Sequence, residues 1–266
     1  MGSTPAPALQ PPLTPELPAP FAWSGAHIAC ALPGGRALFT TRRGGVSVPP
    51  YDTLNLGVRT ADDPACVSAN RDRVAGLVQI PRERTLQGLQ VHGAVVRRAR
   101  ELPEPTAPLS EADGQATALE GIAAVVLTAD CLAVALVARE AVAMIHAGWR
   151  GLAAGVLAEG VRGLRELGAA GTVHAAIGPA AGACCYETGP EVHAALASYG
   201  PLARRGDNAD LKYVARRQLE DAGVGEVHEA GLCTICAAPG LFFSHRRDGA
   251  TTGRQAGVVQ RVPWPS

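Results

Sequence analysis

A cysteine and a histidine lie at the open end of one predicted β-hairpin in the middle of the chain. Two apolar segments, Leu132–Ala138 and Ala141–Ile145, meet at the polar pair Arg139-Glu140, where we expect the turn. Antiparallel pairing across this turn sets Cys131 opposite the residues around His146 or one pleat away. A thiol and an imidazole at that distance can share one ligand.

A second imidazole belongs to the segment Gln90-Val-His-Gly93. His92 follows no local spacing rule, so it must reach the hairpin through the fold. Two imidazoles and a thiolate leave a fourth position open, as in catalytic zinc sites. Taken alone, Cys131 is better explained as a small buried core residue. His146 could instead form a local hydrogen bond before a helix, and His92 could be a core imidazole bonded to a carbonyl.

Composition and charge narrow the classes of partner. Lysine plus arginine and aspartate plus glutamate number 24 each, so no net charge attracts nucleic acid or a membrane surface. The seven cysteines are an odd number, and the first twenty residues lack a basic start and an apolar core, which favours a reducing cytoplasm. No apolar run approaches the roughly 20 residues that cross a bilayer. We therefore expect a cytoplasmic protein with a small-molecule substrate.

The distribution of prolines and apolar residues indicates one main domain after an extended arm. We expect a proline-rich arm over residues 1–22 and a catalytic domain over residues 23–266. Strands and helices alternate without the regular spacing of a doubly wound sheet, which favours a mixed α/β or α+β domain. The other expected elements are a strand over Val173–Ile177 and helices over Gly151–Leu167, Glu191–Ser198 and Asp210–Ala222.

Several short motifs follow one another in a fixed order from about Gly35 onward. They are Phe39–Ser47 with Leu54–Gly57, Gln90–Gly93, Thr128–Cys131, His146–Gly151, Ile177–Pro179 with Cys184–Glu187, and Phe243–Gly249 with Thr252–Arg254. The ordered set resembles the YfiH-like proteins, long labelled multicopper polyphenol oxidases or laccase-domain proteins. Ala183 departs from the pattern, because a proline is common at that position.

The resemblance implies a fold, a metal and an activity. It implies a single α+β domain of mixed sheets covered by helices, related in shape to cysteine-hydrolase-like toxin domains. It also implies zinc bound by the residues that match His92, Cys131 and His146, and copper can compete for such ligands. The implied chemistry is phosphorolysis of adenosine, inosine and methylthioadenosine, with phosphate as co-substrate, together with adenosine deamination.

Arginines and one carboxylate are candidates for the catalytic machinery. Arg150 precedes the start of an expected helix, where backbone N–H groups and the helix dipole favour an anion. Arg42 and Arg246 fall in family motifs, and a phosphorolytic enzyme needs several donors around phosphate. On sequence alone, each is as easily an ordinary exposed arginine. Asp130 can orient a ligand or exchange a proton.

Four residues are candidates for substrate binding. Asn55 and Gln90 can read a base or a sugar, although turn chemistry explains both equally well. Cys184 and Tyr186 are assigned to the pocket by the family motif alone. The Cys-x-x-Cys segment Cys233–Cys236 is weak evidence for zinc, because no second such pair accompanies it.

Three function classes stay open. We do not expect a true four-copper laccase, because such an oxidase requires many imidazoles, typically in His-x-His pairs, and the chain has seven histidines and no such pair. The signature of zinc-dependent base deaminases is absent too, so deamination would need another arrangement. We favour a zinc-dependent purine nucleoside enzyme, acting as a monomer or a weak homodimer. The alternatives are a cysteine hydrolase that edits peptidoglycan precursors, with Cys131 as nucleophile and His146 as base, and a non-enzymatic zinc-stabilised binding module.

Overall fold

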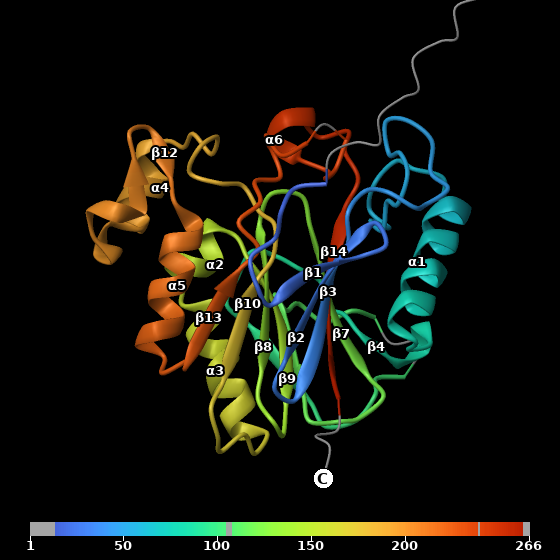
Figure 1. Cartoon of the computed structure of the whole chain (residues 1–266), viewed down its shortest axis with the longest axis horizontal. Helices are drawn as coiled ribbons and strands as arrows, with labels where there is room; N and C mark the ends of the chain where they lie inside the picture. Colours follow the sequence, from blue (N-terminus) through green and yellow to red (C-terminus); the bar gives the residue numbers. More distant parts are fainter. Residues whose placement is uncertain (1–13, 105–107, 239, 263–266) are drawn as a thin grey trace, which may run out of the picture.

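Two six-stranded sheets pack face to face between two layers of helices (Figure 1). The computed structural model describes residues 14–104, 108–238 and 240–262. The first sheet has the order β1 (Phe21–Ser24), β2 (His27–Leu32), β3 (Gly35–Phe39), β14 (Gln255–Arg261), β7 (Ala123–Thr128) and β4 (Thr85–Leu86). The second has the order β13 (Glu226–Glu229), β10 (His174–Ile177), β8 (Leu132–Val137), β9 (Val142–Ala147), β6 (Gly114–Thr117) and β5 (Val96–Ala99).

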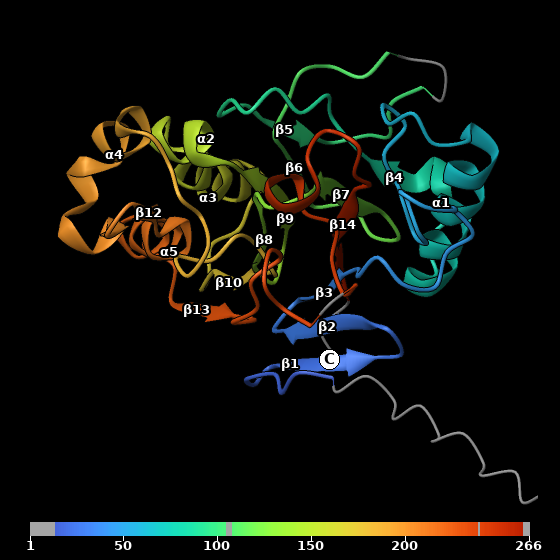
Figure 2. The same cartoon turned by 90° about the horizontal axis from the view of Figure 1, so that it is seen from above.

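Helices cover the outer face of the second sheet and part of the outer face of the first, as the view from above shows (Figure 2). Helix α1 (Pro64–Val78) packs on the first sheet, and α3 (Val156–Glu166) packs on the second with α5 (Leu211–Asp221) beside it. The remaining short elements are α2 (Trp149–Ala153), α4 (Pro190–Ala195), α6 (His245–Asp248), η1 (Arg82–Arg84), η2 (Ala197–Tyr199), η3 (Pro201–Ala203), β11 (Arg204–Arg205) and β12 (Asn208–Ala209).

The central hairpin is apolar on both faces because both faces are covered. Ala133, Ala135 and Val137 of β8 pack against the first sheet, whereas the alternate residues of β8 pack under the helices. Gly257 of β14 allows the two sheets to approach, since an added Cβ there would lie 2.6 Å from Ala133 Cβ. Every residue of β8 and β9 is buried, so this hairpin is a rigid base for any side chain at its end.

The structure confirms the predicted hairpin and the α+β class. Strands β8 and β9 pair antiparallel, with Leu132 opposite Ala147 and Ala133 opposite His146. The predicted single helix over residues 151–167 is wrong in one respect: it is two helices, α2 and α3. Gly155 separates them with a positive φ of 79°, a left-handed conformation that glycine adopts without strain.

The last residues of the predicted arm pack on the first sheet. Leu17 contacts its buried cluster, and the Trp23 Nε1–H group donates to the Pro15 carbonyl at 2.8 Å. Residues 1–13 lie outside the described residues, so the division of the chain at residue 22 stays a prediction. Among the helices in the described ranges, none has the length and apolarity needed to cross a membrane.

Candidate active site

The open end of the central hairpin brings a thiol and two imidazoles together. Cys131 directly precedes β8, and His146 lies near the end of β9. The Sγ atom of Cys131 and one ring nitrogen each of His92 and His146 all lie within 4.8 Å of one another. The two imidazole rings meet edge to face, with their centroids 4.9 Å apart. The three predicted metal ligands therefore converge on one point.

Asp113 explains how His92 reaches the hairpin. This buried carboxylate accepts hydrogen bonds from the backbone N–H groups of His92 at 2.9 Å and Gly93 at 2.7 Å. Its Oδ1 atom also lies 2.7 Å from His146 Nδ1, so the other ring nitrogen of His146 is left for a ligand. His92 itself has a positive φ of 61°, a strained conformation that these bonds help to hold.

The electrostatics of the site favour a thiolate. Burial alone would raise the pKa of Cys131, but the facing His146 and His92 outweigh it and lower the pKa to about 6. Burial alone would lower the pKa of His146, but Cys131 and Asp113 raise it to about 9. At neutral pH the unmetallated pair is therefore a thiolate beside an imidazolium, and the thiolate is the form that binds a metal.

Space and donor chemistry both fit a transition-metal ion at this point. One thiolate and two imidazoles match the preferences of zinc and copper. Gly148 keeps the space beside them clear, because an added Cβ would lie 3.1 Å from Cys131 Sγ and 3.0 Å from His92 Cδ2. His92, Cys131 and His146 would thus hold the ion and leave further coordination positions on the open side.

The three ligands line a cavity of about 510 Å³. This volume lies in the range of sites that enclose small molecules. Its wall combines cationic and aromatic side chains with amide groups, among them Gln90, Trp149, Arg150, Tyr186, His245, Arg246 and Arg254.

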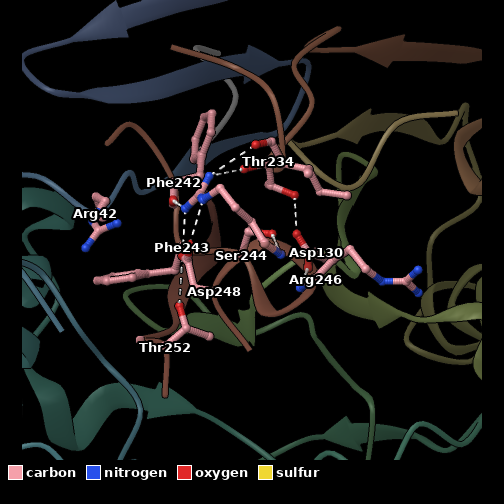
Figure 3. A network of polar contacts seen from close by, with 12 residues as sticks. Arg42, Asp130, Thr234, Phe242, Phe243, Ser244, Arg246, Asp248 and Thr252 are labelled. Atoms are coloured by element: carbon pink, nitrogen blue, oxygen red, sulfur yellow. Dashed lines mark hydrogen bonds and ion pairs between the residues drawn. The ribbon is translucent and has the colours of Figure 1, made fainter. Parts of the chain in front are cut away.

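Asp130 positions one wall of this cavity. Its Oδ1 atom accepts from Thr234 Oγ1 at 2.6 Å, and its Oδ2 atom accepts from the backbone N–H of Arg246 at 2.6 Å (Figure 3). Both carboxylate oxygens are therefore engaged. Asp130 thus links the segment that carries Cys131 to α6, and its predicted role in orienting a ligand or exchanging a proton stays a prediction.

Two of the three predicted phosphate-binding arginines line the cavity. Arg150 lies with its guanidinium carbon 4.3 Å from the centre of the Trp149 ring, and Arg246 lies 4.8 Å from the centre of the Tyr186 ring. Arg246 also donates to the Glu187 carbonyl. Both guanidinium groups retain N–H donors that can face an anion.

Arg42 lies elsewhere. Its guanidinium forms an ion pair with Asp52 at 2.8 Å and stacks 4.7 Å from the centre of the Phe243 ring. Figure 3 shows Arg42 well apart from Arg246, with Phe243 and Ser244 drawn between them. The structure therefore does not bring Arg42 to the metal ligands.

The side-chain amides of Asn55 and Gln90 bind neighbouring backbone groups. Asn55 is fully buried, donates to Asp62 Oδ2 at 2.9 Å and accepts from the backbone N–H of Arg254 at 2.9 Å. Gln90 lines the cavity, but its side-chain amide pairs with both backbone groups of Leu127, at 2.7 and 2.8 Å. Their engaged amide groups indicate that they position neighbouring residues.

Sequence reasoning missed Asp113 and Arg254. Burial lowers the pKa of Arg254, while the nearby Cys131 and Asp130 raise it, so a cation lies close to the candidate thiolate. Arg254 stands in a motif that was already apparent, whereas no spacing rule points to Asp113. Cys184 was expected in the pocket, but it belongs to a separate cluster with Cys185, Cys233 and Cys236.

Comparisons with known proteins agree with this geometry. Residues 36–262 match the family model described as multi-copper polyphenol oxidoreductase laccase. A Xylella fastidiosa protein named purine nucleoside phosphorylase is 41% identical over 251 residues, which cover 87% of this chain and 93% of that protein. A Streptomyces coelicolor protein with the name purine nucleoside phosphorylase is 41% identical over 229 residues, covering 83% of this chain and 93% of its own length.

Solved structures show the same fold. The crystal structure of YlmD from Geobacillus stearothermophilus has a TM-score of 0.84 and 34% sequence identity, covering 92% of this chain and 99% of that one. The Bacillus licheniformis protein YfiH has a TM-score of 0.81 and 29% identity, covering 92% of this chain and 100% of its own.

Proposed function

This chain belongs to the family described as multi-copper polyphenol oxidoreductase laccase, and on that premise we propose that it is a zinc-dependent purine nucleoside phosphorylase. The observation that carries the proposal is the meeting of one thiolate and two imidazoles in a cavity whose wall holds Arg150, Arg246 and Arg254. Two relatives that are 41% identical in sequence over most of this chain bear the name purine nucleoside phosphorylase.

The cavity offers the groups that phosphorolysis needs. The guanidinium groups of Arg150, Arg246 and Arg254 can hold phosphate by charge-assisted hydrogen bonds. A phosphate oxygen then forms a bond to C1′ of the ribose while the C1′–N9 bond breaks, with its electron pair moving to the purine. Tyr186 and Trp149 give the base and sugar apolar surface next to these cations.

His92, Cys131 and His146 would hold the metal ion, and zinc suits this donor set. When bound, such an ion supplies a Lewis acid that polarises an oxygen or nitrogen of the substrate. Asp113 fixes the ring of His146 and the backbone of His92, which keeps the donors in place. Asp130 holds the start of α6 and therefore the position of Arg246.

Adenosine, inosine and methylthioadenosine are the proposed substrates, with adenosine deamination as a second activity. Copper at the same ligands, a cytoplasmic location and a monomeric or weakly dimeric state also stay predictions. None of them is needed for the central proposal, which concerns a purine nucleoside, phosphate and one metal ion.

A cysteine hydrolase is the second candidate, favoured by one observation. Cys131, His146 and Asp113 form a chain of thiolate, imidazolium and carboxylate, the order found in cysteine nucleophiles activated by histidine. An amidase acting on peptidoglycan precursors would use Cys131 to attack an amide carbonyl. A metal bound by the same sulfur would block this attack, so the two candidates exclude each other at one site.

Product analysis separates the candidates. Protein of defined zinc content is incubated with adenosine, with and without phosphate, and the products are identified by mass spectrometry. The proposal expects adenine and ribose 1-phosphate only when phosphate is present. Inosine as the sole product would show deamination and contradict the proposed phosphorolysis. Unchanged adenosine in both samples would favour the cysteine hydrolase.

A further inference from the structure

Four cysteines that the proposed reaction does not use lie together beside the cavity: Cys184, Cys185, Cys233 and Cys236. Their sulfur atoms all lie within 4.8 Å of one another, and those of Cys184 and Cys236 are 3.6 Å apart. All four are free thiols. We propose that this four-cysteine cluster binds one zinc ion, at a site separate from His92, Cys131 and His146.

The spacing of the sulfurs fits a single ion. Four thiolates around zinc, each at about 2.3 Å, stand about 3.8 Å from one another in a tetrahedron. Tetrahedral sulfur sites select zinc or iron–sulfur clusters. A cluster with several irons must spread its cysteines over more than one metal, whereas here every sulfur lies close to every other. The geometry therefore favours one zinc ion.

The backbone around Cys233 is arranged to stabilise a thiolate. The backbone N–H group of Gly182 donates to Cys233 Sγ at 3.2 Å. Backbone N–H groups directed at a ligand sulfur orient it and offset its charge, as they do for other metal ligands.

A cation also lies beside the cluster. The guanidinium of Arg247 donates to the carbonyl groups of Thr234 at 3.1 Å and Ile235 at 3.3 Å, both between the two cysteines of the second segment. Four thiolates and one Zn²⁺ carry a net charge of about −2 by the charges of the ligand-binding forms. Arg247, which also forms an ion pair with Asp248 at 2.7 Å, holds the backbone of this segment in place without occupying a coordination position.

Two segments far apart in the sequence are held together at this point. Ala180 pairs with Cys233 in a parallel bridge, and the backbone N–H of Thr234 donates to the Ala180 carbonyl at 3.1 Å. Gly182 leaves room for the sulfurs, because an added Cβ would lie 3.1 Å from Cys184 Sγ and 3.5 Å from Cys233 Sγ. The two pairs of cysteines thus face each other across a short stretch of paired backbone.

The role of this zinc is structural. Four protein ligands fill a tetrahedral site and leave no position for a substrate. Both joined segments reach the cavity, the first through Tyr186 in its wall and the second through Thr234, which donates to Asp130. The ion would therefore hold the cavity wall at Tyr186 in place relative to the segment that carries Asp130 and Cys131.

Metal analysis on full-length protein, purified under reducing conditions without a metal-binding tag, tests this proposal. Zinc, iron and copper are measured per chain in the wild type and in Cys236→Ser, Cys131→Ser and Cys66→Ser. Wild type and Cys66→Ser should hold two zinc ions, because Cys66 lies on α1 outside both clusters. Cys236→Ser and Cys131→Ser should each lose one.

Cys236→Ser could fail to fold, so a second measurement uses X-ray absorption on Cys131→Ser. The four-cysteine cluster is intact in Cys131→Ser. The expected spectrum shows zinc with four sulfur neighbours at about 2.3 Å. Iron in place of zinc, disulfide bonds among these cysteines, or four thiols that stay free and metal-free with added zinc would each overturn the proposal. None of these readouts depends on nucleoside turnover, so the proposed function is judged separately.

Discussion

One buried carboxylate holds two of the three candidate metal ligands in place, and one of these two faces the third. Asp113 accepts from the backbone of His92 and contacts the ring of His146, and His146 in turn faces Cys131. Removing its charge leaves the shape of the side chain nearly unchanged but weakens both contacts. The thiolate and the ring orientation therefore depend on a fully buried residue that does not line the cavity.

We expect Asp113→Asn to lower zinc affinity at the active site by about 10- to 100-fold, the usual effect of losing a carboxylate behind a histidine ligand. The measurement is competition with a chelator of known affinity. Asp207→Asn is the matched control, because its side chain is 83% exposed in an ion pair with Arg204. Equal affinities for the two variants would contradict the role given to Asp113.

The pH dependence of thiol reactivity tests the electrostatics of the metal-free site. Because the pKa of Cys131 is lowered to about 6, its alkylation rate should rise through pH 6 and stay high at neutral pH. Cys66 serves as the internal control, since burial and the neighbouring Asp63 raise its pKa. Peptide mass spectrometry after brief alkylation measures the extent of modification of Cys131 and of Cys66 at each pH. Reactivity of Cys131 that appears only near pH 9 would be the contrary result.

The pH dependence of folding stability is a poorer measure of the Cys131–His146 pair, because the effects of the two pKa shifts on proton binding cancel near neutral pH. The raised pKa of His146 contributes stability below about pH 6.5 that is lost as pH rises through about 9. The lowered pKa of Cys131 contributes stability above about pH 9 that is lost as pH falls through about 6. Between these limits the folded and unfolded pair binds the same number of protons.

At the scale of elements, the central hairpin could be predicted from the sequence and the position of His92 could not. Two apolar runs around a polar turn specify antiparallel pairing, and this places Cys131 near His146. His92 is held by Asp113, 21 residues away, through backbone bonds that no periodicity reveals. Similarly, the apolar spacing of residues 151–167 predicts a helix but hides the break at Gly155.

The turn after β9 gives a prediction of its own. Gly148→Ala should reduce zinc occupancy at His92, Cys131 and His146 while leaving the fold intact, because the φ of −80° at Gly148 suits alanine but the new Cβ meets two ligands. Gly171→Ala is the control, since nothing lies within 4 Å of an added Cβ there. Zinc content and circular dichroism are measured on both. Full occupancy in Gly148→Ala would show that the ion does not need this space.

At the scale of the whole molecule, the α+β class follows from the mixed pattern of strands and helices, but the sandwich does not. Whether two sheets stack depends on which small residues face each other, and Gly257 opposite Ala133 becomes visible only in three dimensions. The same holds for the arginines. Motif membership pointed equally to Arg42 and Arg246, whereas folding directs Arg42 to Asp52 and Phe243.

The contact between the sheets predicts an overpacking effect. Gly257→Ala should destabilise the protein by about 1–3 kcal/mol, because its Cβ would lie 2.6 Å from Ala133 Cβ and 3.0 Å from Met144 Sδ. Gly76→Ala, in α1 with nothing within 4 Å of the added Cβ, should instead stabilise it by about 0.5–1 kcal/mol. Urea unfolding measures both. A neutral Gly257→Ala would mean that the sheets can separate at little cost.

The central claim is that turnover requires the metal at His92, Cys131 and His146. Its most direct measurement is the rate of phosphate-dependent adenine release, determined with zinc content on the same samples of wild type and Cys131→Ser. The account predicts that chelated wild type loses activity in proportion to zinc removed from this site and regains it with added zinc. Cys131→Ser should lack both the activity and the zinc ion of this site. Metal-free wild type with full activity, beside an inactive Cys131→Ser, would contradict it and assign Cys131 as a nucleophile.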